Sequence, residues 1–268
     1  MSYSVSQVSA LSVVLPASAL AICVTYSVAY HSDHSLATHC QTANYLPSIS
    51  AAVGETSPEK QIWSLFLTVS CALRLILAMA YYQEICGRLR RVQDCCLTGG
   101  HFAVNCLELA ALFGLSVVSS SDNFPIHRNC FAIFLISSSV YMLLHLRVCC
   151  RLRSRQKLTD RQLISTRSFY IKLISFGVYC LSTALAVYFY MRHQALCERL
   201  MYTYFAASEY IVVYMNILFH STSYFDLSHL SVGLVLDRWS NCVTASFNEA
   251  DYAFEHSRPW RPLIMQIA

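Results

Sequence analysis

The chain has 268 residues, of which 56% are hydrophobic and only 13% are charged. A soluble globular domain carries roughly 25% charged residues, so this composition excludes an ordinary water-soluble domain. The formal net charge is +4. The basic residues lie in loops between apolar stretches and form no aromatic-laced groove, which argues against a nucleic-acid partner.

Six long apolar stretches predict six transmembrane helices, at residues 11–30, 62–82, 101–119, 130–150, 170–190 and 201–225. Each is close to the length of about 20 residues that a helix needs to cross the hydrocarbon core. Lipid cannot hydrogen-bond the backbone, and these stretches are too long for barrel strands. We therefore predict an all-α, polytopic membrane protein with one six-helix bundle over residues 1–227. A polar tail, 228–268, follows, in which 234–247 is either an interfacial segment or part of a loosely ordered tail.

The basic residues predict the orientation, because Lys and Arg in short loops favour the cytosolic side. Arg88, Arg90 and Arg91 follow the second stretch, and a denser basic group lies between residues 147 and 167. Both loops are predicted to be cytosolic, which places both termini in the cytosol and residues 31–61 in the lumen. A cleaved signal peptide is the alternative for the first stretch, but that stretch lacks a basic n-region and is long for an h-region.

The predicted topology sorts the 13 cysteines by compartment. Only Cys40 and Cys197 fall clearly in luminal loops, where an oxidising environment favours a disulfide between them. Two free thiols are the alternative, because sequence alone gives no distance between them. No CxxC pair occurs, so no metal site is predicted.

Ionisable residues inside the apolar stretches stand out, because a lone charge in hydrocarbon is costly. Arg74 and Glu108 lie at similar depths in consecutive antiparallel helices, which predicts an ion pair. A pair that only pins the two helices together is favoured over a catalytic pair.

Glu209, Asn216 and His220 share one face of the last predicted helix. This face either lines a cavity for a lipid headgroup or satisfies polar groups on neighbouring helices. Among the predicted luminal histidines, His39 and His127 are candidates for a general base near neutral pH, although an exposed histidine is usually a surface residue. No GxSxG, HExxH, P-loop or GxGxxG sequence occurs. Standard hydrolase, zinc-protease and nucleotide-dependent activities therefore have no support, and no cofactor is predicted.

Several separated blocks resemble the post-GPI-attachment-to-proteins factor 2 family, within the wider Frag/DRAM/Sfk superfamily. The blocks are ATHCQTANYLPSIS at 37–50, SSSDNFPIH at 119–127, ALAVYF at 184–189, Cys197-Glu198, Glu209-Tyr210, Asn216, Phe219-His220 and Asp226, with Arg74 and Glu108 in matching helices. The similarity extends over residues 10–227. The chain departs from the family pattern at Tyr190 and Met191, which precede Arg192 and His193, so no role is carried onto His193.

The resemblance implies a multi-pass protein of the Golgi membrane, with the endoplasmic reticulum as the alternative location. It implies that the chain promotes the reacylation of lyso-GPI on GPI-anchored proteins with a saturated fatty acid. The expected partners are GPI-anchored proteins, lyso-GPI lipid, the membrane and, if the chain only assists, an acyltransferase. The resemblance leaves open whether the chain is the acyltransferase or an accessory subunit, and it does not identify the acyl donor.

If the chain is the enzyme, we expect His127 to act as the general base, and His39 or Asn44 to orient the headgroup phosphate. Substrate contacts are expected from a further set, namely Tyr45, Glu209, Asn216 and His220. The alternative from other branches of the superfamily is a non-enzymatic membrane regulator, of autophagy as in the DRAM type or of lipid asymmetry as in the Sfk type.

Overall fold

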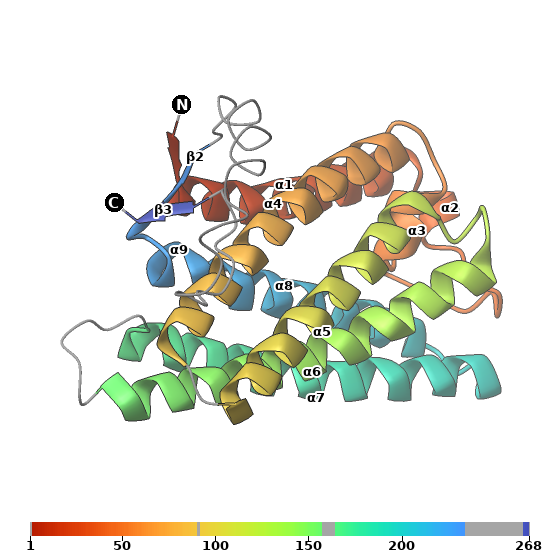
Figure 1. Ribbon diagram of the computed structural model, residues 1–268. Helices are drawn as coiled ribbons and strands as arrows, with labels where there is room; N and C mark the ends of the chain where they lie inside the picture. Colours follow the sequence, from red (N-terminus) through yellow and green to blue (C-terminus); the bar gives the residue numbers. More distant parts are fainter. Residues whose placement is uncertain (1, 90–91, 157–163, 234–264, 268) are drawn as a thin grey trace, which may run out of the picture.

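The computed structural model describes residues 2–89, 92–156, 164–233 and 265–267. Its long helices are α1 (Val5–Tyr30), α4 (Glu59–Arg88), α5 (Val92–Val117), α6 (Phe124–Gln156), α7 (Thr166–Leu196) and α8 (Met201–Ser221). The short helices α2 (Ser32–Ser35) and α3 (Ile49–Gly54) lie between α1 and α4, and α9 (Ser223–Asp226) follows α8. The long helices run alongside one another as one bundle (Figure 1). The predicted all-α polytopic fold is confirmed.

Within the described ranges, α1, α4, α6, α7 and residues 96–117 of α5 are long and apolar enough to span a membrane. Helix α8 is also long enough, with 21 residues, but it is not among these helices. Glu209, Asn216 and His220 lower its hydropathy. The sixth span and the cytosolic termini therefore remain predictions.

Local capping explains where two of these helices begin and end. The Ser4 hydroxyl accepts a hydrogen bond from the Ser6 backbone N–H, and the Gln7 side chain accepts one from the Ser4 N–H, which forms a capping box before α1. Helix α7 begins after Ser165, whose side chain accepts from the Ser168 N–H. It ends at Cys197, which has a left-handed φ of 48°.

A small antiparallel sheet, which the sequence did not predict, joins the two ends of the chain. Its order is β1 (Ser2–Ser4), β2 (Leu230–Gly233), β3 (Met265–Ile267). Ser2 pairs with Gly233, and Leu230 pairs with Ile267. We call this end of the bundle the sheet end (Figure 1). The predicted interfacial segment, 234–247, lies outside the described residues.

Side chains in this bundle are distributed as expected in lipid rather than in water. Large apolar side chains face outward on all the long helices, among them Leu11, Ile22, Leu65, Leu75, Leu107, Phe113, Ile136, Ile174, Leu181, Val187, Ile211 and Leu218. The interior, in contrast, holds many polar side chains. One face of α5 alone buries Asp94, Thr98, His101, Asn105 and Glu108. Polar groups gather inside because lipid offers them no hydrogen bonds.

Helices α5 and α6 approach closely at Gly114. A Cβ atom at this position would lie 2.8 Å from the Sγ atom of Cys130. The absence of a side chain therefore lets the two helices pack closely, as small residues do in other membrane bundles.

Candidate functional site

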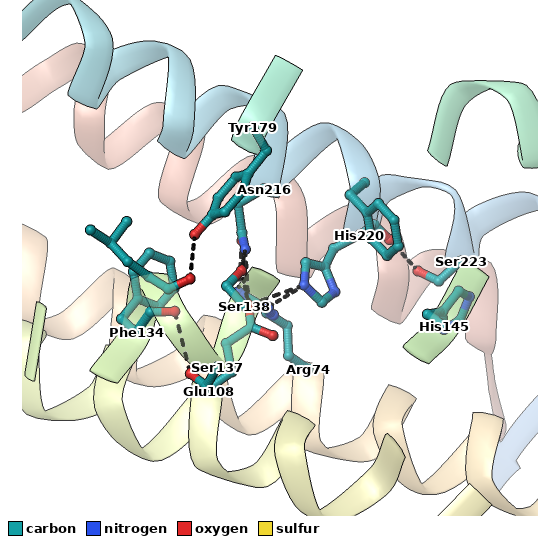
Figure 2. Close-up of polar contacts among 12 residues, drawn as sticks. Arg74, Glu108, Phe134, Ser137, Ser138, His145, Tyr179, Asn216, His220 and Ser223 are labelled. Carbon is teal, nitrogen blue, oxygen red and sulfur yellow. Dashed lines mark hydrogen bonds and ion pairs between the residues drawn. The ribbon is translucent and has the colours of Figure 1, made fainter. Parts of the chain in front are cut away.

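Five polar residues from four helices meet inside the bundle, and we call them the interior cluster: Arg74 (α4), Glu108 (α5), Ser138 (α6), Asn216 and His220 (α8) (Figure 2). Glu108 is fully buried and Arg74 is 8% exposed. The Oε1 atom of Glu108 accepts hydrogen bonds from Arg74 Nη2 at 2.8 Å, Asn216 Nδ2 at 2.9 Å and Ser138 Oγ at 3.2 Å. The predicted Arg74–Glu108 pair thus forms the centre of a larger hydrogen-bonded group.

His220 lies between the two members of the Arg74–Glu108 pair. Its Nε2 atom lies 2.5 Å from Arg74 Nη2 and 3.3 Å from Glu108 Oε1. Because a guanidinium group can only donate and a carboxylate can only accept, the tautomer of His220 decides which of the two it hydrogen-bonds. The imidazole ring is held in place by stacking on Tyr141, with ring centroids 5.2 Å apart.

A second buried ion pair lies nearer the sheet end and was missed by the sequence analysis. Lys172 (α7) donates to Asp226 (α9) and to the Ser168 hydroxyl, and the Tyr81 hydroxyl (α4) donates to Asp226 Oδ2 at 2.9 Å. Lys172 is 1% exposed and Asp226 is 2% exposed. Lys172 lies inside the predicted stretch 170–190, so the criterion that singled out Arg74 and Glu108 would also have identified it.

The predicted substrate-binding residues divide between two places. Asn216 and His220 belong to the interior cluster, whereas Asn44, Tyr45 and Glu209 lie where α8 contacts the segment before α3. Two turns of α8, about 10 Å along its axis, separate Glu209 from Asn216. The sequence correctly placed Glu209, Asn216 and His220 on one helix, but they do not form one site.

Asn44 and Glu209 hold the segment 44–49 against α8. The Thr203 hydroxyl donates to Asn44 Oδ1 at 2.8 Å and accepts from the Tyr45 backbone N–H at 3.1 Å. Glu209 Oε2 accepts from the Ile49 backbone N–H at 2.9 Å, at the start of α3. The Tyr45 side chain, by contrast, is 71% exposed. Among these three residues, only Tyr45 presents its side chain to an incoming molecule.

Replacing Glu209 with alanine is expected to destabilise the protein by about 1–3 kcal/mol, because the buried Ile49 N–H loses its side-chain acceptor. Glu209→Gln keeps an acceptor oxygen and should lose less. Thermal unfolding in detergent measures stability, and limited proteolysis of residues 37–58 measures detachment of the segment. Equal behaviour of the alanine variant and the unaltered protein in both experiments would contradict this anchoring role.

Three connections meet at the end of the bundle opposite the sheet, which we call the disulfide end (Figure 1). Cys40 and Cys197 are bonded, with their Cα atoms 5.5 Å apart. Ser121 donates to the Gly54 carbonyl at 3.0 Å. Lys60 Nζ lies 2.7 Å from Asp122 Oδ1, and this hydrogen bond lowers the pKa of the Asp122 carboxyl. The loops that the basic-residue pattern assigned to one compartment therefore lie together.

The two candidate catalytic histidines lie in different surroundings at this end. His127 Nδ1 lies 2.8 Å from the Val118 carbonyl oxygen. Because a carbonyl only accepts, Nδ1 carries the proton and the neutral ring keeps its lone pair on Nε2. His39 is exposed, and its ring packs edge-on against His193 at 4.9 Å. Within the described part of the chain, no hydrogen bond or ring contact joins His127 to His39.

Residues 4–230 match the family model described as the Frag1/DRAM/Sfk1/Cwh43P N-terminal domain. The chain is 35% identical to post-GPI attachment to proteins factor 2 of Caenorhabditis briggsae, over 89% of this chain and 88% of the relative. It is 37% identical to the protein of the same name from Caenorhabditis elegans, over 79% and 81% of the two chains. It is 34% identical to acyltransferase PGAP2 of Xenopus tropicalis, over 80% and 84%. No solved structure gives a significant match.

The family-model match includes the whole helical bundle, from the last residue of β1 to the first residue of β2. The matching region contains the interior cluster, the disulfide and the segment 44–49. The chain therefore belongs to the post-GPI attachment to proteins factor 2 family, within the group that shares the Frag1/DRAM/Sfk1/Cwh43P N-terminal domain.

Proposed function

We propose that this protein takes part in GPI-anchor remodelling, by promoting the reacylation of lyso-GPI on GPI-anchored proteins with a saturated fatty acid. The observation that carries the proposal is family membership over nearly the whole helical bundle. The names of the relatives refer to post-GPI attachment steps, and two relatives are named acyltransferases. In this proposal the protein resides in the Golgi membrane, with its disulfide end in the lumen.

Acyl transfer to a hydroxyl group needs a base that removes the hydroxyl proton as the oxygen attacks the acyl carbonyl. In the proposed reaction His127 Nε2 takes this proton from the free glycerol hydroxyl of lyso-GPI. The donor is a fatty acyl ester or thioester. Its acyl–oxygen or acyl–sulfur bond breaks, and the imidazolium returns the proton to the leaving group. The Val118 carbonyl supports His127 by accepting a hydrogen bond from its Nδ1–H throughout.

At the disulfide end, exposed side chains are better placed to contact the lyso-GPI headgroup than side chains that hold segment 44–49 against α8. His39 and Tyr45 are exposed, and we assign to them the contacts with the headgroup phosphate and sugars. The side-chain amide of Asn44 is already engaged at both ends, since its Nδ2 donates to the Leu36 carbonyl and its Oδ1 accepts from the Thr203 hydroxyl. Asn44 and Glu209 are therefore positioning residues in this proposal.

Expression in cells that lack the endogenous family member tests the function. Mass spectrometry of a GPI-anchored reporter gives the lipid on its anchor, and an immunoassay of the medium gives the amount shed. We expect two-chain saturated anchors and reduced shedding. Unchanged lyso-anchors, from a well-expressed chain that imaging places in the Golgi, would overturn the proposal and favour a regulator of the DRAM or Sfk type.

A further inference from the structure

His193, near the end of α7, is a buried residue with two unsatisfied ring nitrogens in the described part of the structure. Its side chain is 0% exposed, and neither ring nitrogen has a hydrogen-bond partner among the described residues. A buried polar group left unsatisfied costs about 1–3 kcal/mol. Buried histidines with two free nitrogens are therefore rare in stable folds and point to a missing partner.

Three potential metal ligands belong to the chain segments around His193. Cys197 caps the C-terminal end of α7, four residues after His193, and its backbone N–H donates to the His193 carbonyl at 3.0 Å. Its bonded partner Cys40 is adjacent in sequence to His39, whose Nε2 lies 3.1 Å from Cys40 Sγ. One donor atom from each of His39, Cys40 and His193 lies within 4.8 Å of the others. The disulfide thus brings together two histidine–cysteine pairs from distant parts of the chain.

We propose that, when the Cys40–Cys197 disulfide is reduced, these two thiolates and the imidazoles of His39 and His193 bind one Zn²⁺ ion. Two cysteines and two histidines form the tetrahedral donor set that structural zinc sites use, with Zn–S distances of about 2.3 Å and Zn–N distances of about 2.0–2.1 Å. At these lengths the two sulfur atoms must separate to roughly 3.8 Å. The set contains no carboxylate, which favours zinc over calcium or magnesium.

The disulfide and the zinc site exclude each other, because a sulfur in a disulfide is not a thiolate ligand. A dithiol of the oxidoreductase class supplies two electrons and two protons, becomes a disulfide itself, and leaves two free thiols on this chain. Zinc then displaces both thiol protons into solvent. Either the disulfide or the metal ion holds the connection before α3 against the end of α7. In this proposal the two segments therefore stay linked in both redox states.

The sequence did not predict this site, because its ligands are not arranged as CxxC pairs. They occur as His39-Cys40 and as His193 followed four residues later by Cys197, more than 150 residues away along the chain. Only folding brings the two pairs into contact.

Metal titration of the full-length protein in detergent tests the proposal. The protein is reduced with a phosphine, the phosphine is removed, and Co²⁺ or Zn²⁺ is added under argon. We expect the reduced protein to bind one equivalent of Zn²⁺ by elemental analysis. With Co²⁺ we expect a thiolate-to-metal charge-transfer band and the visible bands of tetrahedral cobalt. The oxidised protein should show neither.

Two variants distinguish this site from the other thiols in the chain. His39→Ala removes an exposed side chain and keeps all 13 cysteines, so we expect it to fold and to bind Zn²⁺ at least about tenfold more weakly. Cys96→Ser/Cys150→Ser removes two exposed thiols at other positions, and we expect this variant still to bind one equivalent of Zn²⁺. A reduced protein that binds no cobalt, or equal affinity in the His39→Ala variant, would overturn the site. Neither readout depends on GPI remodelling.

Discussion

Replacing Glu108 with glutamine is expected to destabilise the protein by about 3–5 kcal/mol, the usual cost of removing one partner of a buried ion pair. The amide keeps the shape of the side chain but leaves the buried guanidinium of Arg74 without a counter-charge. It also weakens the acceptor shared by Asn216 and Ser138. Thermal unfolding of the purified protein in detergent, together with the yield of folded protein, measures the effect.

Two control variants show whether this loss comes from the buried charge. Arg74→Met/Glu108→Leu removes both charges, so it should recover part of the stability that Glu108→Gln loses. Asp122→Asn breaks the exposed pair with Lys60 and should unfold close to the temperature of the unaltered protein. If Glu108→Gln folds normally and abolishes remodelling instead, the pair is part of the chemistry, which is the alternative that the sequence left open.

Replacing His127 with alanine is expected to abolish remodelling without loss of the protein. A general base contributes about 10²–10⁴-fold to a reaction rate, so the cellular rescue should fall to background. The fold should survive, because His127 makes one hydrogen bond to the Val118 carbonyl, and a hydrogen bond contributes about 0.5–1.5 kcal/mol. The readout is the lipid on the reporter anchor, normalised to the amount of protein in the Golgi.

The matched control for this variant is His34→Ala. His34 is an exposed histidine in α2, also at the disulfide end, and its loss should leave remodelling unchanged. Normal remodelling by the His127→Ala variant would exclude this residue as the base. The proposed pathway would then still be supported by the unaltered protein, but the role of the chain would move toward that of an accessory subunit.

Sequence reasoning worked best where one physical constraint acts on a single segment. Lipid forces each apolar stretch to satisfy its own backbone hydrogen bonds, so the predicted stretches coincide with the observed helices. Two ends differ: the stretch 101–119 runs past the end of α5 at Val117, and the last stretch is divided at Thr222 between α8 and α9. The Arg74–Glu108 contact was also predictable, because two consecutive antiparallel helices bring equal depths together. The small sheet was not predictable, because its strands of three or four residues are too short to show an alternating pattern.

The sequence by itself determined that this is a helical membrane protein, that Arg74 and Glu108 carry charge inside it, and which family it belongs to. The tertiary structure decided which side chains contact one another. Asn216 and His220 join Glu108 because α5 and α6 pass beside that level of α8, whereas Glu209, two turns away, meets the start of α3. Helical periodicity specifies a face, but the element that packs there is set by how the whole chain fills the bundle. For the same reason His193 and His39 are neighbours only in the folded bundle, where the distant cysteines also meet.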